Sequence, residues 1–129
     1  MIIVDSSVWI DHFRDAETVA VQKFRSIKDT DSIRVADLVR LELLLGVRSD
    51  QHVTRIKRAI GPFAGVCLLD HVPVDECAAN YRFLRSKGVT IRKSIDVIIG
   101  SFCIRQGCEL LHDDRDFTLM AEHLDLKLY

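Results

Sequence analysis

Ile2-Ile3-Val4-Asp5-Ser6-Ser7 opens the sequence with three apolar residues that lead directly into a carboxylate and two hydroxyl side chains. A short, uninterrupted apolar run is typical of a strand buried on both faces of a parallel sheet. Ser6 and Ser7 are candidate N-caps for a helix that continues to Phe13. Ligands of open α/β sheets bind beyond the carboxyl ends of the strands. The stretch therefore predicts an α/β fold with Asp5 at the edge of the sheet where chemistry is expected.

Outside this stretch, segments with strand and helix patterns alternate along the chain. Further helices are predicted over residues 18–27, 38–46, 51–60, 74–84, 95–106 and 115–123, and further strands over 32–35, 65–69, 109–112 and 126–128. Asp37 and Ser94 are expected to cap two of the helices, and Gly107 to end one. The alternation predicts a three-layer α/β/α fold with a central, mainly parallel sheet, and residues 1–129 as one domain.

The composition is globular, with 48% hydrophobic and 29% charged residues, two prolines and six glycines. The N-terminus lacks the basic region of a signal peptide, and the longest apolar runs, such as residues 43–47, are far too short to span a membrane. Four cysteines without CxxC spacing are expected to be small buried thiols. We therefore expect a cytoplasmic protein that does not bind membranes.

Four carboxylates occupy positions at predicted strand ends or in apolar helices, where an acid calls for an explanation. Asp5 and Asp114 follow predicted strands, Glu42 interrupts the apolar stripe of its helix, and Asp96 lies in the first turn of another helix. Each has an ordinary alternative: helix capping for Asp5, a favourable helix-dipole interaction for Asp96, and a side chain that reaches solvent for Glu42.

Carboxylates brought together in this way need a neutralising cation, and Mg²⁺ or Mn²⁺ prefers such oxygen ligands. An all-carboxylate site of this kind points to phosphoryl chemistry. No nucleotide-binding loop, nucleophile elbow or HExxH motif competes with this interpretation. The formal net charge of −1 becomes +4 when Asp116 and these four acids are set aside, and arginine, which suits phosphate contacts, outnumbers lysine twelve to six.

The sequence resembles the PIN-domain ribonucleases, in particular the VapC toxins of bacterial toxin–antitoxin pairs. The matching segments are Ile3 to Ile10, the leucine-rich helix around Glu42, Ser94 to Gly100, and Leu110 to Phe117, and their order and spacing match over essentially the whole chain. The resemblance implies an α/β/α fold, metal-dependent endonucleolytic cleavage of RNA, and an antitoxin of the VapB kind that covers the site. It also favours a homodimer, or a hetero-oligomer with the antitoxin.

The resemblance also assigns roles to individual residues. Asp5, Glu42, Asp96 and Asp114 match the acidic quartet of the family, and Asp116 matches a frequent fifth acid. Asp5, Asp96 and Asp114 are expected to hold one or two ions, while Glu42 orients or deprotonates water or helps to hold a second ion. Ser7 matches the hydroxyl residue that supports the first acid.

Further contacts are expected around these acids. Arg85, Lys87, Arg92 and Lys93 flank the Asp96 helix and are candidates to hold the RNA backbone, although an ordinary solvated surface explains them equally well. His112 replaces the Thr or Ser of many family members, and it either assists the site or binds a backbone carbonyl. We expect an amphipathic antitoxin segment to pack on Trp9, Phe13 and the 38–47 helix.

Three other protein classes fit parts of the pattern. A phospho-accepting receiver domain needs paired acids after the first strand and a strand-end lysine, but Asp5 precedes two serines and residues 110–112 contain no lysine. A phosphatase with a DxD nucleophile fails because position 7 is serine. A catalytically idle binding domain would not need its acids, and a metal titration distinguishes it from a nuclease.

Overall fold

The computed structural model describes residues 1–129 and contains a five-stranded sheet with the order β3-β2-β1-β4-β5. The strands are β1 (Ile2–Val4), β2 (Ile33–Ala36), β3 (Ala64–Val66), β4 (Glu109–Leu111) and β5 (Lys127–Leu128). All neighbouring strands pair in parallel, and Ile2 lies opposite both Ile33 and Glu109. The carboxyl ends of all five strands therefore meet at one edge. The predicted parallel sheet is confirmed.

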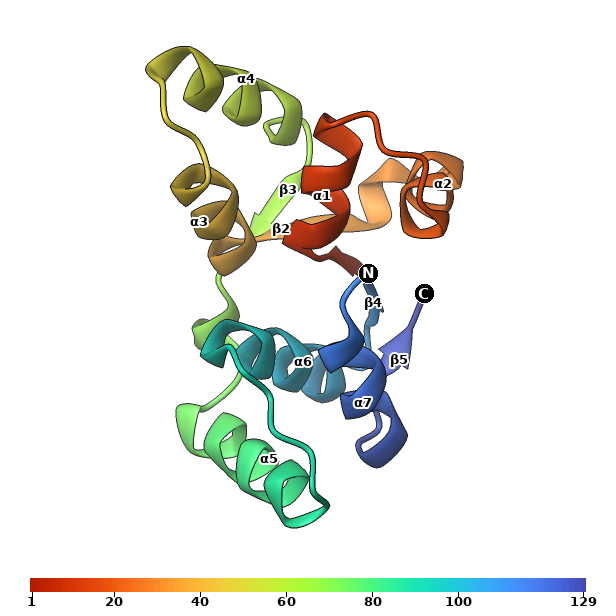
Figure 1. The fold of residues 1–129 in the computed structure, drawn as a ribbon, viewed down its shortest axis with the longest axis vertical. Coiled ribbons are helices and arrows are strands. Elements are labelled where there is room, and N and C mark those ends of the chain that lie inside the picture. Colours follow the sequence, from red (N-terminus) through yellow and green to blue (C-terminus); the bar gives the residue numbers. More distant parts are fainter.

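Seven helices surround the sheet in a three-layer arrangement. They are α1 (Ser6–Phe13), α2 (Val19–Ser26), α3 (Asp37–Leu45), α4 (Asp50–Ile60), α5 (Val74–Ser86), α6 (Ser94–Gln106) and α7 (Arg115–His123). Figure 1 shows α1 to α4 gathered on one side of the central strands and α5 to α7 on the other. Short 3₁₀ turns at Thr30–Ser32 and Leu68–Asp70 complete the connections. The predicted α/β/α fold is confirmed.

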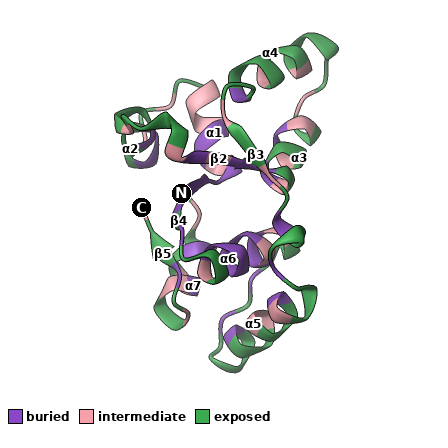
Figure 2. Ribbon diagram, turned by 180° about the vertical axis from the view of Figure 1, so that it is seen from behind, coloured by how far each residue is buried: buried purple, intermediate pink, exposed green.

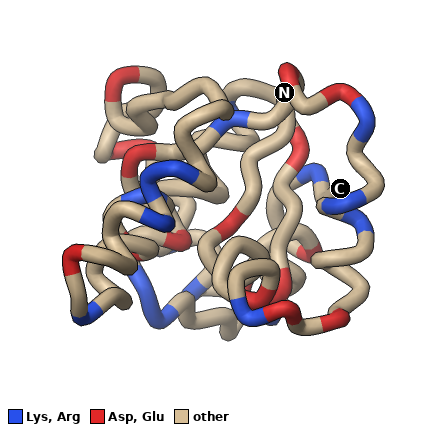
Figure 3. Tube along the Cα trace, turned by 90° about the horizontal axis from the view of Figure 1, so that it is seen from above, with Lys and Arg blue, Asp and Glu red and all other residues tan.

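One core holds the layers together. Ile3, Val4 and Leu110 of the central strands and Ile99 of α6 are fully buried, as the apolar runs of β1 and β4 predict. Figure 2 shows the burial concentrated in the central strands and α6, whereas α4, α5 and β5 are largely exposed. Acidic and basic residues are interleaved along the trace seen from above (Figure 3), so the overall charge distribution does not by itself mark a site.

Helix α7 packs closely on α6 because position 100 has no side chain. A Cβ atom built on Gly100 would collide with the side chain of the buried Met120. Asp114 is the N-cap of α7, and Asp96 lies in the first turn of α6. None of the helices combines the length and apolar character that a membrane crossing requires.

Several element ends differ from the sequence-based predictions. Asp5, rather than Ser6 or Ser7, is the N-cap of α1. Asp37 and Ser94 are the first helical residues of α3 and α6 and not their caps. The predicted strand 65–69 is divided into β3 and a 3₁₀ turn. Gly107 ends α6 with φ 62°, the left-handed conformation that favours glycine.

Candidate active site

The acidic residues gather where the direction of the chain across the sheet changes. From β1 the chain proceeds to β2 and β3 on one side, and it then crosses to β4 and β5 on the other. β1 and β4 are neighbours, and the amide of Asp5 donates to the carbonyl of Leu111 at 2.9 Å. Crevices at such points are the usual ligand sites of open parallel sheets.

Asp5 is 3% exposed, and its two carboxylate oxygens have different environments. Oδ2 accepts hydrogen bonds from the amide of Ser7 at 3.0 Å and from the Ser7 hydroxyl at 2.5 Å. The Ser7 Oγ also accepts from the amide of Asp113 at 3.1 Å, so it ties the loop after β4 to Asp5. Oδ1 is buried and has no partner. Asp5 therefore caps its helix with one oxygen and leaves the other available for a ligand.

Asp96 is also 3% exposed, and its Oδ2 is the second buried carboxylate oxygen without a partner. Burial raises the pKa of Asp96 to about 7, and the nearby charges of Asp5, Asp114 and Glu42 raise it further against the opposing effect of Lys93. The carboxyl group titrates near neutral pH in the absence of a cation. The helix-dipole alternative does not explain this shift, because a helix N-terminus stabilises the charged form.

Glu42 on α3 is half-buried and is held by a residue that sequence reasoning missed. The hydroxyl of Ser6, which is 8% exposed, donates to Glu42 Oε2 at 2.8 Å. This bond joins the first turn of α1 to α3 across 36 positions of sequence. The only signal for this role in the sequence is a hydroxyl side chain close to the end of a strand that is predicted to be buried.

Asp114 and Asp116 follow β4 and occupy the start of α7. Asp114 Oδ1 accepts from the amide of Asp116 at 2.9 Å, so Asp114 is the N-cap of this helix. Asp116 is 6% exposed, and its Oδ2 accepts from the backbone amide of Arg92 at 3.4 Å and lies 3.7 Å from Arg92 Nε. Asp116 therefore contacts the connection before α6.

His112 lies between these acids and Asp5 in a half-buried position. Its Nδ1 accepts from the amide of Asp114 at 3.1 Å, and its ring lies 5.3 Å from that of Phe117. In this contact Nδ1 accepts and does not bind a backbone carbonyl, and both alternatives for the role of His112 stay open. Burial lowers the pKa of His112, although the nearby acids oppose the shift. The role of His112 toward substrate stays a prediction.

No three His, Cys, Asp or Glu side chains are arranged as ligands of one ion, so the predicted triplet of Asp5, Asp96 and Asp114 is not preformed. The fit to a hard cation rests on Asp5 and Asp96, whose buried oxygens lack hydrogen-bond partners. Mg²⁺ typically binds to one or two carboxylates and keeps several water ligands. A pair of carboxylates of this kind is a suitable donor set.

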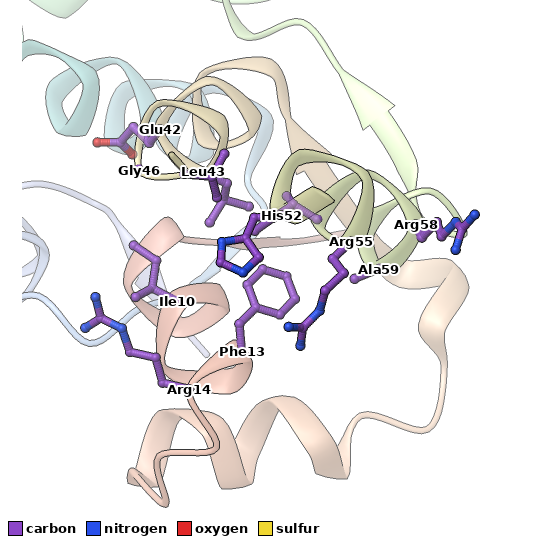
Figure 4. A pocket seen from close by; sticks show the side chains of 12 residues that line it. Ile10, Phe13, Arg14, Glu42, Leu43, Gly46, His52, Arg55, Arg58 and Ala59 are labelled. Atoms are coloured by element: carbon purple, nitrogen blue, oxygen red, sulfur yellow. The ribbon is translucent and has the colours of Figure 1, made fainter. Parts of the chain in front are cut away.

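A groove of about 750 Å³ begins at Glu42 and lies between α1, α3 and α4. Figure 4 shows Ile10, Phe13 and Leu43 lining it, with Glu42 at one end. Three arginines also line it: Arg14, Arg55 and Arg58. Trp9, which we expected to be part of an exposed surface, is 1% exposed and packs on Phe24 and Phe63, so that expectation is wrong.

Comparison with known proteins agrees with this geometry. A model of the PIN domain matches residues 2–123. Ribonuclease VapC11 of Mycobacterium tuberculosis is 28% identical over 98% of this chain and 96% of its own length. A structure of FitAB bound to a DNA fragment superposes with a TM-score of 0.74 at 14% identity, over 100% of this chain and 94% of that one. A structure of VapBC2 from Rickettsia felis bound to DNA from its promoter superposes with a TM-score of 0.72 at 16% identity, over 100% of this chain and 98% of that one.

Proposed function

This chain belongs to the PIN-domain family, and from that premise we propose that it is a metal-dependent endoribonuclease and the toxin of a type II toxin–antitoxin pair. The observation that carries the nuclease proposal is the pair of buried carboxylate oxygens without partners on Asp5 and Asp96. The ribonuclease names of relatives that match nearly the whole chain support RNA as the substrate.

Asp5 and Asp96 would hold Mg²⁺ or Mn²⁺, with Asp114 close enough to influence the charge of Asp96. A bound ion would lower the pKa of a water molecule and stabilise charge on the scissile phosphate. Ser7 fixes the rotamer of Asp5, and Ser6 fixes that of Glu42. Glu42 is then positioned to accept a proton from the attacking water.

Cleavage of RNA by the purified protein tests this proposal. We expect endonucleolytic cleavage in Mg²⁺ or Mn²⁺, none in EDTA, and strongly reduced cleavage with Asp96→Asn. The exposed Asp31→Asn is the matched control and should behave as the wild type. Activity that persists in EDTA would exclude the metal mechanism, and mapping of RNA 5′ ends after induction in cells would identify the substrate.

The proposed antitoxin occupies the groove beside Glu42. Its floor is apolar at Ile10, Phe13 and Leu43, and it leads to the acidic site, so an amphipathic segment that carries an Arg or Lys at one end would both fill it and neutralise the acids. The VapBC complexes among the structures of the same fold support a partner of this kind.

Variants that the antitoxin can no longer neutralise test whether it binds in the groove. Ala59→Arg places a large side chain in the groove on an exposed, helix-compatible position. We expect this variant to arrest growth even when the antitoxin is co-expressed. Gln51→Arg, exposed on the same helix but outside the groove, should remain neutralised. Rescue of both variants would place the antitoxin elsewhere.

We also propose that the protein is a homodimer through α3. Leu41 and Leu45 lie one turn apart on this helix and are 44% and 73% exposed. Light scattering of purified protein should give a dimer for the wild type and a monomer for Leu45→Glu. A monomeric wild type would exclude this arrangement.

A further inference from the structure

The connection from α5 to α6 carries an unusually one-sided charge. Between Glu76 and Asp96 the chain contains five cations and no acid, and the rest of the chain consequently sums to −6. These cations, which we call the cationic track, are Arg82, Arg85, Lys87, Arg92 and Lys93, and all five are exposed. The track begins on the outer helix α5 and ends at Lys93, the N-cap of α6, three positions before Asp96 in the first turn of that helix.

The connection is held in one conformation. The amides of Gly88 and Val89 donate to the carbonyls of Arg85 and Leu84 at 3.0 and 2.9 Å, which closes α5 as a Schellman motif. Gly88 has φ 80°, so this turn depends on glycine. Val89 and Ile91 are 8% and 3% exposed and anchor the segment in the core.

The far end of the connection is fixed by a buried acid. The amide and side chain of Arg92 both contact Asp116, while the side chain of Arg92 stays 78% exposed. Figure 1 shows this connection leading from the end of α5 back to the start of α6. The exposed cations are thus displayed on a backbone that is already ordered, which reduces the entropy lost on binding a ligand.

Two aromatic rings accompany the cations. Phe83 is 43% exposed, and Lys87 Nζ lies 5.4 Å from the centre of its ring. Arg85 lies similarly over Tyr81, at 5.7 Å. Tyr81 is half-buried against the core, so Phe83 is the ring available to a ligand. Cations beside an exposed aromatic ring bind single-stranded nucleic acid, because the cations contact phosphates and the ring stacks with a base whatever its identity.

We infer that the cationic track binds single-stranded RNA and leads it to the carboxylate site, with Phe83 as a stacking platform for a base. This inference rests on the proposed ribonuclease function and deepens it, because it names the surface of this chain that holds the strand and the ring that stacks with a base. A duplex hides its base faces in its own stack, so Phe83 would gain nothing from it. Five exposed cations also predict that binding depends strongly on salt.

The test is binding in EDTA, where no metal-dependent cleavage can occur. Fluorescence anisotropy of a labelled oligouridylate and of a labelled RNA duplex without a loop is measured over a range of salt concentrations. We expect the wild type to bind the single strand more tightly. Phe83→Ala should weaken this binding about 5- to 20-fold, and Phe83→Leu, which keeps the apolar side chain but removes the ring, should weaken it similarly.

Lys87→Gln should lower the slope of log affinity against log salt by about 0.7, the value for one phosphate contact on a single strand. Lys28→Gln, an exposed lysine outside the track, is the control and should leave the slope unchanged. Wild-type affinity in the Phe83 and Lys87 variants, or equal affinity for the duplex, would overturn the inference. If those variants bind as the wild type does while the wild type still cleaves RNA, only the track is wrong. If the wild type binds through the track but cleaves no RNA, the endoribonuclease proposal is wrong.

Discussion

The carboxylate site and the cationic track both concentrate charge, but they do so in opposite environments. Asp5 and Asp96 are almost fully buried, and each has an oxygen without a partner. The cations of the track are exposed to solvent and free of neighbouring acids in sequence. Buried like charges cost stability until a ligand of opposite sign arrives, whereas exposed charges cost little and are screened by salt. Chemistry and substrate binding should therefore be separable by mutation in this chain.

Asp96→Asn should produce the largest change. We expect cleavage to fall by about 100-fold or more, because a charged donor to the ion is lost. RNA binding in EDTA should stay close to that of the wild type, because the track is untouched. Gel-based cleavage assays and anisotropy measure the two quantities. A variant that fails to fold, as judged by circular dichroism, would instead identify Asp96 as a structural residue.

The pH dependence of stability should show the cost of the buried acids. The pKa of Asp96 rises from an ordinary 3.8 to about 7 on folding, so the folded state holds an extra proton between these values. This contribution to stability is present at low pH and is lost as pH rises through about 7. Between pH 5 and pH 8 the free energy of unfolding of the metal-free wild type should fall by about 2–3 kcal/mol more than that of Asp96→Asn.

Urea unfolding at the two pH values measures this difference, and Mg²⁺ should restore stability at pH 8 more than at pH 5. Parallel pH profiles for the wild type and the variant would show that Asp96 is not held protonated.

Ser6→Ala should produce an intermediate change, confined to catalysis. Loss of the hydroxyl that donates to Glu42 should lower kcat about 10-fold, as expected for a hydrogen bond to a charged group, with little change in KM. Ser6→Thr should restore most of the activity, and Ser26→Ala, which removes an exposed hydroxyl on α2, is the control. If Ser6→Ala raises KM alone, Ser6 has no role in positioning Glu42.

Asp116→Asn should have the smallest effect of these variants. It should weaken substrate binding, as loss of a cation from the track would, and leave catalysis unchanged. An asparagine oxygen can still accept from the Arg92 amide, so only the ion pair with the exposed Arg92 side chain is lost. We expect KM to rise about 2- to 5-fold with kcat preserved. The catalytic role first assigned to Asp116 predicts instead a loss of kcat comparable to that of Asp96→Asn. Steady-state kinetics of the two variants side by side distinguishes the roles.

Much of the fold could be predicted from local sequence signals. The bounds of α7 agree fully with the prediction, and Gly107 ends α6 as expected, because both depend on residues within a few positions of each other. The first helix cap was misassigned because Asp5, Ser6 and Ser7 are all good caps, and only tertiary contacts decide between them. Ser7 bonds to Asp5, and Ser6 bonds to Glu42.

The surroundings of the acids were harder to predict than the acids themselves. A carboxylate in an apolar context is visible in the sequence, as with Glu42 and Asp96. The contacts of Ser6 with Glu42 and of Arg92 with Asp116 join residues 36 and 24 positions apart, and no local pattern encodes them. The burial of Trp9 likewise depends on Phe24 and Phe63, which come from other elements.

The pairing of β1 with β4 also constrains the biosynthesis of the protein. It joins residues 2–4 to residues 109–111, nearly the full length of the chain. A nascent chain that has not yet released β4 from the ribosome contains Asp5, Glu42 and Asp96 but lacks the strand beside which they assemble. Folding must wait for this long-range contact, which makes it slow relative to helix formation. The proposed nuclease site therefore forms only after β4 has emerged from the ribosome.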